Sequence, residues 1–159
     1  MRRISHAIPP ALAALPPDDA NDALFAAVGP VDGLHVLVIG GAGLEVLCGL
    51  IRRGCTAAAE IPLTDRCTGA DPADIAILPR LDSLAEAAGA MVLAARLVLP
   101  GGRLVLRDGT GRLARAIAAL LPRHGFSAPR RIADGRQVLL VAERPFFGPH
   151  LHSTCLLNA

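Results

Sequence analysis

The sequence contains no lysine, no tryptophan and no tyrosine, and it has only four phenylalanines in 159 residues. All 16 basic residues are therefore arginines, which excludes a Schiff-base lysine, a P-loop lysine and a lysine general base. The scarcity of aromatic rings leaves no platform on which nucleic-acid bases could stack. Because 14 acidic residues nearly balance the basic ones, we expect no nucleic-acid partner.

Long apolar runs and paired cysteines are missing as well. The four cysteines form no Cys-x-x-Cys pair, and the first residues lack the continuous apolar stretch of a secretory signal. The richest apolar segment, residues 87–100, is interrupted by Arg96 and is shorter than the roughly 20 residues that cross a bilayer. We therefore expect reduced thiols, no membrane partner and a cytoplasmic location.

The residues that are present predict one folded domain with two flanking segments. The chain is 52% hydrophobic, and its length suits a single core. Residues 1–33 read as an amino-terminal arm followed by an entry helix, which Asp18 or Asp19 can cap. Residues 34–145 form the predicted α/β domain, and residues 146–159 form an apolar carboxyl-terminal tail.

Strand and helix patterns alternate through the predicted domain. Short apolar runs predict strands at 34–39, 57–61, 74–78 and 103–107, and apolar residues at helical spacing predict helices at 44–53, 83–99 and 111–124. Residues 128–133 and 137–143 flank a short turn and predict a hairpin. This order indicates a three-layer α/β fold with a mostly parallel central sheet and a terminal antiparallel β-hairpin.

Several motifs in this order resemble the class I S-adenosylmethionine-dependent methyltransferases. They are the strand and glycine turn VLVIGGAG, Glu60 at the end of the second strand, the strand DIAIL, and the run LVLPGGRLVLRDG. The tail of the domain, LLPRHGFSAPRRIADGRQVLLVAERP, is similar to the last helix and hairpin of that family. The resemblance covers about residues 34–145 and implies a methyltransferase-like, Rossmann-like fold.

The resemblance also implies a cofactor, S-adenosylmethionine, over the carboxyl ends of the central strands. Gly40, Gly41 and Gly43 would face its methionine portion. Glu60 would accept hydrogen bonds from the two ribose hydroxyls, a role that suits a carboxylate. Leu78, Pro79 and Arg80, with the two residues that follow them, would border the methyl group and its acceptor.

The chain departs from the family pattern at three places. Val38 stands where the family commonly has an acidic residue, and Ala42 and Leu44 stand where it has later glycines of the turn. Only residues 62–73 remain for a helix, a third strand and another helix. Asp65 or Asp71 are candidates for an acidic group on the adenine side of the site.

Three functions are consistent with these residues. The first is an S-adenosylmethionine-binding methyltransferase with an unknown acceptor, and the second is a catalytically inactive methyltransferase-fold interaction or assembly module. The third is a nicotinamide-dinucleotide-binding protein, because Gly41 and Gly43 also begin a GxGxxG-like pattern that ends at Val46. The glycine turn can equally be a tight turn with no ligand. Asp82 is a candidate base, although its position just before a helix favours a cap.

The tail is the segment outside the family pattern. His150, His152 and Cys155 carry metal-ligand atoms, but structural zinc usually takes four ligands, so we expect no metal site. Phe146, Phe147 and three leucines make the tail apolar. Since exposed apolar surface favours association, we expect a homodimer or a protein partner bound through it.

Overall fold

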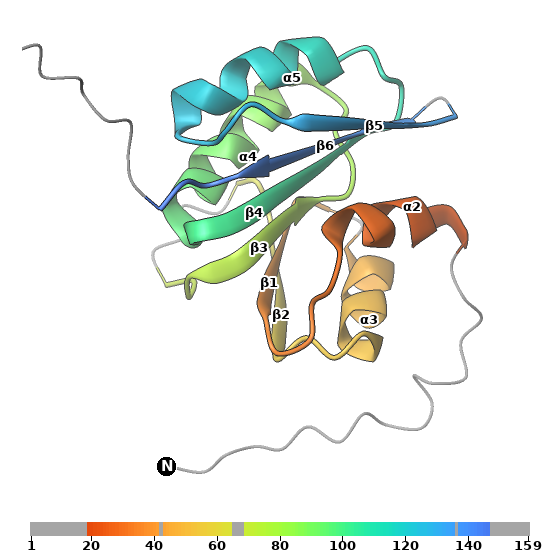
Figure 1. The fold of residues 1–159 in the computed structure, drawn as a ribbon, viewed down its shortest axis with the longest axis vertical. Coiled ribbons are helices and arrows are strands. Elements are labelled where there is room, and N and C mark those ends of the chain that lie inside the picture. The colour runs from red at the N-terminus through yellow and green to blue at the C-terminus, as the bar shows by residue number, and fades with distance from the viewer. Residues whose placement is uncertain (1–18, 42, 65–68, 136, 147–159) are drawn as a thin grey trace, which may run out of the picture.

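The computed structural model describes residues 19–41, 43–64, 69–135 and 137–146. In these residues a six-stranded sheet carries helices on both faces (Figure 1). The elements in chain order are α2 (Asp19–Val28), β1 (His35–Ile39), α3 (Leu44–Arg52), β2 (Ala57–Ile61), β3 (Ala73–Leu78), α4 (Leu84–Leu97), β4 (Val98–Asp108), α5 (Ala114–Leu120), the 3-10 helix η1 (Leu121–His124), β5 (Arg130–Asp134) and β6 (Gln137–Glu143).

The strand order is β2-β1-β3-β4-β6-β5. The first four strands of this order are parallel, and β6 is antiparallel to both β4 and β5. The predicted α/β class, the mostly parallel sheet and the terminal hairpin are therefore confirmed. Parallel strands place their carboxyl ends at one edge of the sheet, where open α/β sheets bind ligands.

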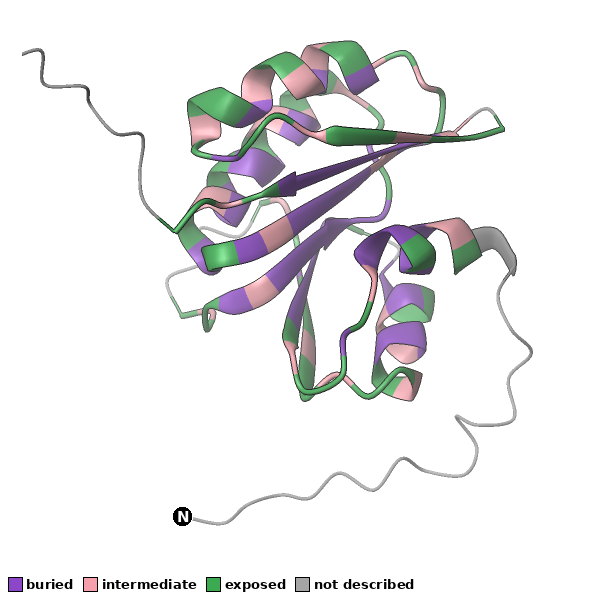
Figure 2. Ribbon diagram, viewed as in Figure 1, coloured by how far each residue is buried: buried purple, intermediate pink, exposed green. Residues whose placement is uncertain are grey.

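Alternate side chains of the central strands enter two separate cores. Leu37 and Ile39 of β1 pack on the face that α4 and α5 cover, whereas Val36 and Val38 pack on the face that α2 and α3 cover. Figure 2 shows the central strands buried along most of their length between these two layers. Because both faces are apolar, the strand sequences read as continuous hydrophobic runs.

The helix predicted at 83–99 ends earlier than expected. It ends at Leu97, and Pro100, Gly101 and Gly102 belong to an irregular stretch of β4 instead of a turn before it. The pairing of β3 with β4 shifts register here, because Ala73 pairs with Val98 whereas Ile75, two residues later, pairs with Arg103. Backbone hydrogen bonds from Gly101 to Arg144 and from Arg144 to Gly102 hold this stretch beside the end of β6.

The helix predicted at 111–124 begins three residues later, at Ala114. Its last four residues form the 3-10 helix η1, because Pro122 has no N–H for the α-helical hydrogen bond. Gly125 then adopts the left-handed conformation, with φ of 83°, and ends the helix as predicted.

The sheet has an open side next to β2. Within the described residues no strand pairs with the outer edge of β2. Ala57 and Ala59 of this strand are exposed. Among the described residues, none covers these two alanines on the α4 face of the sheet.

Candidate functional site

The glycine turn after β1 lies at the carboxyl edge of the sheet. Gly40 is buried and has φ of 102°, a conformation that favours glycine over residues with a Cβ. Its amide donates to the carbonyl of Ile61, 2.9 Å away, which ties the turn to the end of β2. Gly41 is exposed, and a Cβ built on it would meet no atom within 4 Å. Its backbone is therefore open to a ligand.

Glu60 packs against Gly43 at the start of α3. A Cβ on Gly43 would lie 2.9 Å from Cδ of Glu60 and 3.0 Å from Cγ1 of Val38. The register Val38↔Glu60 places this carboxylate one residue before the end of β2, beside the glycine turn. The structure thus brings together two of the predicted site features, the glycines and the acidic residue.

Leu78, Pro79 and Arg80 follow one another at the end of β3, but their environments differ. Leu78 is 1% exposed and belongs to the core under α4, so only its backbone borders the edge of the sheet. Pro79 is buried too, and the side chain of Arg80 is exposed. Of the three, Arg80 alone has a side chain that can reach a bound molecule.

Arg80 is held by Asp82. Its Nε donates to Oδ1 of Asp82 at 2.9 Å, and this hydrogen bond, together with the charge of Asp82, raises the pKa of the Arg80 guanidinium above its ordinary value. The prediction that Asp82 caps the next helix is wrong. The cap is Ser83, whose Oγ accepts from the amide of Glu86, while the Glu86 carboxylate accepts from the amide of Asp82.

Two cavities of about 300 Å³ lie along this edge. The first lies beside the glycine turn, and its lining residues are Gly40, Gly41, Leu63, Arg80, Asp82 and Glu86. The second lies beyond β4, and its lining residues are Pro79, Arg80, Leu81, Asp82, Arg107, Gly109, Thr110 and Gln137. Arg80 and Asp82 line both cavities, so the ion pair between these two residues lies where the two cavities adjoin.

The loop after β3 is anchored by a contact that the sequence analysis missed. Arg107 of β4 donates through Nε to the carbonyl of Pro79 and through Nη1 to Oδ1 of Asn21 at 2.8 Å. Asn21 is a buried residue of α2. The entry helix is therefore tied to the site, although 86 positions separate the two side chains in the sequence.

Asp108, also missed, organises the loop beside the second cavity. Its carboxylate is 1% exposed and accepts from the amides of Leu113 at 2.7 Å and Ala114 at 2.8 Å, and from the amide and hydroxyl of Thr110 at 3.0 Å. Burial by itself raises the pKa of Asp108, but these hydrogen bonds outweigh it and hold the pKa below its ordinary value. An ionised Asp108 thus caps the start of α5.

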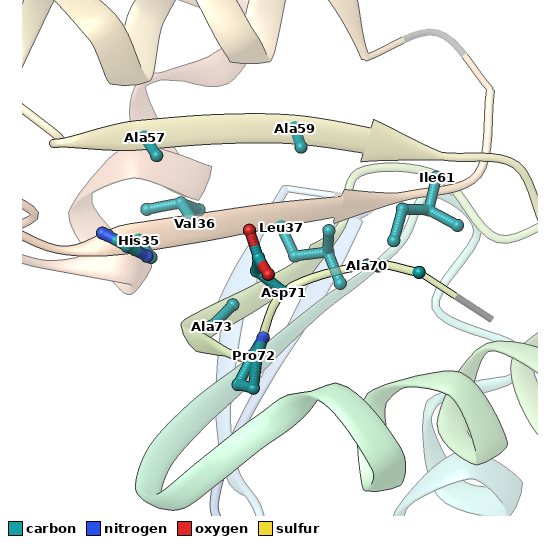
Figure 3. Close-up of a pocket in the computed structure, with 11 residues that line it drawn as sticks. His35, Val36, Leu37, Ala57, Ala59, Ile61, Ala70, Asp71, Pro72 and Ala73 are labelled. Carbon is teal, nitrogen blue, oxygen red and sulfur yellow. The ribbon is translucent and has the colours of Figure 1, made fainter. Parts of the chain in front are cut away.

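A third cavity, of about 310 Å³, lies on the open face of β1 and β2 and not at the carboxyl edge (Figure 3). Asp71 lines this cavity, just before β3 begins, so the structure does not place it with the glycine turn.

Asp65 lies outside the described residues, as do Phe147, His150, His152 and Cys155. Among the described residues, no group of three or more His, Cys, Asp or Glu is placed to hold a metal ion. The described helices include none that is long and apolar enough to cross a membrane.

Comparison with solved structures places this arrangement among known folds. An O-methyltransferase family protein from Burkholderia thailandensis superposes with a TM-score of 0.59 at 17% identity, over 86% of this chain and 55% of its own. Fibrillarin, a pre-rRNA processing protein of Methanococcus jannaschii, gives 0.62 at 12% identity, over 80% and 76%. The fold is methyltransferase-like.

A third similar structure is a 16S rRNA methyltransferase from T. thermophilus, in complex with AdoMet and guanosine. It superposes with a TM-score of 0.60 at 19% identity, over 83% of this chain and 44% of its own. The chain thus spans about half of two of these three proteins. No protein-family model matches the sequence, and no curated protein matches it.

Proposed function

We propose that the chain binds S-adenosylmethionine at the carboxyl ends of β1, β2 and β3 and acts as a methyltransferase on a small acceptor. The observation that carries this proposal is the Glu60 carboxylate packed on Gly43 beside the glycine turn. A residue larger than glycine at position 43 would fill the space that this carboxylate takes. The methyltransferase-like fold supports the same position for a cofactor.

The glycine turn that lines the first cavity fits the methionine portion of the cofactor, and Glu60, which does not line that cavity, fits the ribose. Glu60 offers a carboxylate for two adjacent hydroxyl donors, and Gly40 and Gly41 let the backbone approach a ligand closely. Leu63 adds an apolar wall to the first cavity. A cavity of about 300 Å³ is at the lower end of the range for small-molecule sites.

The second cavity is the candidate acceptor site. It adjoins the first through Arg80 and Asp82, and it offers the polar side chains of Thr110 and Gln137. When bound, the cofactor supplies a methyl group on a sulfonium. The chain's own contribution is to hold an acceptor in line with that methyl group, and such alignment accounts for much of the rate of a two-substrate reaction. We assign no general base, because Asp82 is engaged with Arg80.

A catalytically inactive interaction module is the second candidate, and the open side of β2 favours it. Ala57 and Ala59 are exposed there, and the outer edge of β2 is unpaired within the described chain. An unpaired edge presents backbone donors and acceptors to another polypeptide. The two candidates differ in whether the chain binds the cofactor.

Calorimetric titration of the full chain distinguishes the candidates. The ligands are S-adenosylmethionine, its demethylated product and NADH. The proposal predicts micromolar binding of the first two and no binding of NADH. Binding of NADH alone would indicate a nicotinamide-dinucleotide site. If none of the three binds, the methyltransferase proposal is wrong and the interaction module is favoured.

A further inference from the structure

The third cavity is a mainly apolar opening on the face of the sheet that α4 covers, and His35 and Asp71 are the polar side chains that line it. Its lining includes Leu37, Ile61 and Ala73, which belong to the core on the α4 side, together with the exposed Ala57 and Ala59. Figure 3 shows residues of β1, of β2 and of the segment that leads into β3 arranged around it. Small alanine side chains leave this stretch of sheet uncovered.

The described chain ends close to this cavity. The ring of Phe146 packs on Gly101, where a Cβ would overlap it, and Phe146 is 75% exposed. Gly102, the next residue of β4, lies against the carbonyl of Asp74 in β3. Figure 1 shows the end of β6 beside the starts of β3 and β4. Phe146 therefore contacts β4, the neighbour of β3, and Ala73 at the start of β3 lines the cavity.

The amino-terminal end of the described chain points to a different part of the molecule. α2 begins at Asp19, and its buried residues Leu24, Phe25 and Val28 pack in the core on the opposite face of the sheet. The described chain thus begins on the face that α3 covers. Of the two ends, the carboxyl-terminal one lies on the side of the cavity.

The tail has the length to reach across the cavity. Residues 147–159 are 13 residues, which span at most about 43–47 Å when extended. From β4 to β2 is three strand spacings, about 14 Å, and the five residues of β2 add about 17 Å. The tail also has matching chemistry, because Phe147, Leu151, Leu156 and Leu157 are apolar.

The composition of the tail predicts association with a second copy or a partner, which stays untested; from the position of Phe146 we propose instead that residues 147–159 lie across the open face of β1 and β2 in the same chain and cover the third cavity. Burial of the apolar side chains of the tail against Leu37, Ile61 and the alanines of β2 stabilises this position. The connection through Phe146 keeps the tail at an effective concentration in the millimolar range, which favours its own chain over a second copy. The proposal does not depend on cofactor binding.

Disulfide trapping in the full chain tests this position. Cys48, Cys55 and Cys67 are replaced by serine, so that Cys155 in the tail is the remaining native thiol. A second thiol is then introduced as Ala59→Cys or, in a separate variant, as Ala57→Cys. The matched control is Ala26→Cys, an exposed alanine of α2 on the opposite face. Circular dichroism checks that each variant folds, and mass spectrometry counts bonds within and between chains.

The proposal predicts that an intramolecular disulfide to Cys155 forms at least ten times faster in Ala59→Cys or Ala57→Cys than in Ala26→Cys. Replacement of Leu151, Leu156 and Leu157 by serine should reduce that rate to the control level. Equal rates in all three thiol variants would overturn the proposal. Disulfides that form only between chains would also overturn it and would assign the cavity to the tail of a second copy.

Discussion

Glu60 lies against Gly43 so closely that a Cβ on Gly43 would come within 3.0 Å of Oε2 of Glu60. This contact joins the end of β2 to the start of α3, two elements whose meeting at the carboxyl edge of the sheet forms the proposed ribose site. Gly43 has φ of −84°, so alanine is compatible with its backbone, and only the space is restricted. The contact therefore gives a clean test by substitution.

Gly43→Ala should weaken binding of S-adenosylmethionine at least tenfold, because the new methyl group displaces the Glu60 carboxylate. It should also lower the free energy of unfolding by about 1 kcal/mol, since it crowds the buried Val38. Calorimetry and urea unfolding measure the two effects. Gly89→Ala in α4, where a Cβ meets nothing within 4 Å, is the control and should leave affinity unchanged. An unchanged affinity in Gly43→Ala would place the ligand elsewhere.

Gly49→Ala should destabilise the fold without touching the candidate site. A Cβ on Gly49 would overlap the ring of Phe25, whose face is stacked by the Arg53 guanidinium 3.8 Å from its centroid. Displacing this ring from between α2 and α3 should cost about 1–3 kcal/mol. Urea unfolding beside the Gly89→Ala control measures it. Equal stability of the two variants would contradict the close contact of Phe25 with Gly49.

Asp108→Asn should lower the free energy of unfolding by about 1–3 kcal/mol at neutral pH, because the charged acceptor for the amides of Leu113 and Ala114 is lost. The pKa of Asp108 is lowered in the folded state. As pH falls, the unfolded state therefore takes up the proton first. The stability that Asp108 provides is present above about pH 4 and is lost as pH falls through the lowered pKa.

Urea unfolding of the parent and of Asp108→Asn across this pH range checks the sign. The difference in stability between the two proteins should be constant from neutral pH to about pH 4 and should shrink at lower pH. A difference that grows on acidification would mean that burial, and not hydrogen bonding, dominates at Asp108.

The sequence predicted the order of strands and helices because periodic apolar residues report local structure and burial directly. It did not predict the contact of Arg107 with Asn21, since a hydrogen bond between residues so distant in the chain leaves no local pattern. The choice of Ser83 over Asp82 as the cap depends on which oxygen reaches the amide of Glu86, and both residue types are good caps.

The candidate site was predicted in part. The glycine turn and Glu60 do lie together, because each follows or ends a parallel strand and such ends share one edge of the sheet. Asp108 ends β4 in the same way, but no local pattern indicates that loop amides enclose its carboxylate. The open cavity beside β2 depends on the tertiary arrangement of β1, β2 and the residues that lead into β3, and a sequence pattern does not report exposed surface of this kind.

The central claim is that the Glu60 carboxylate accepts hydrogen bonds from the ribose of S-adenosylmethionine. Its most direct test is the calorimetric Kd of the cofactor for the parent, for Glu60→Ala, and for Glu45→Ala, which removes an exposed carboxylate of the same type from the first turn of α3. A lost hydrogen bond to a charged group costs about 1.5–3 kcal/mol. The account predicts a Kd at least tenfold higher for Glu60→Ala and an unchanged Kd for Glu45→Ala. An equal Kd for the parent and Glu60→Ala, or no binding by the parent, would contradict it.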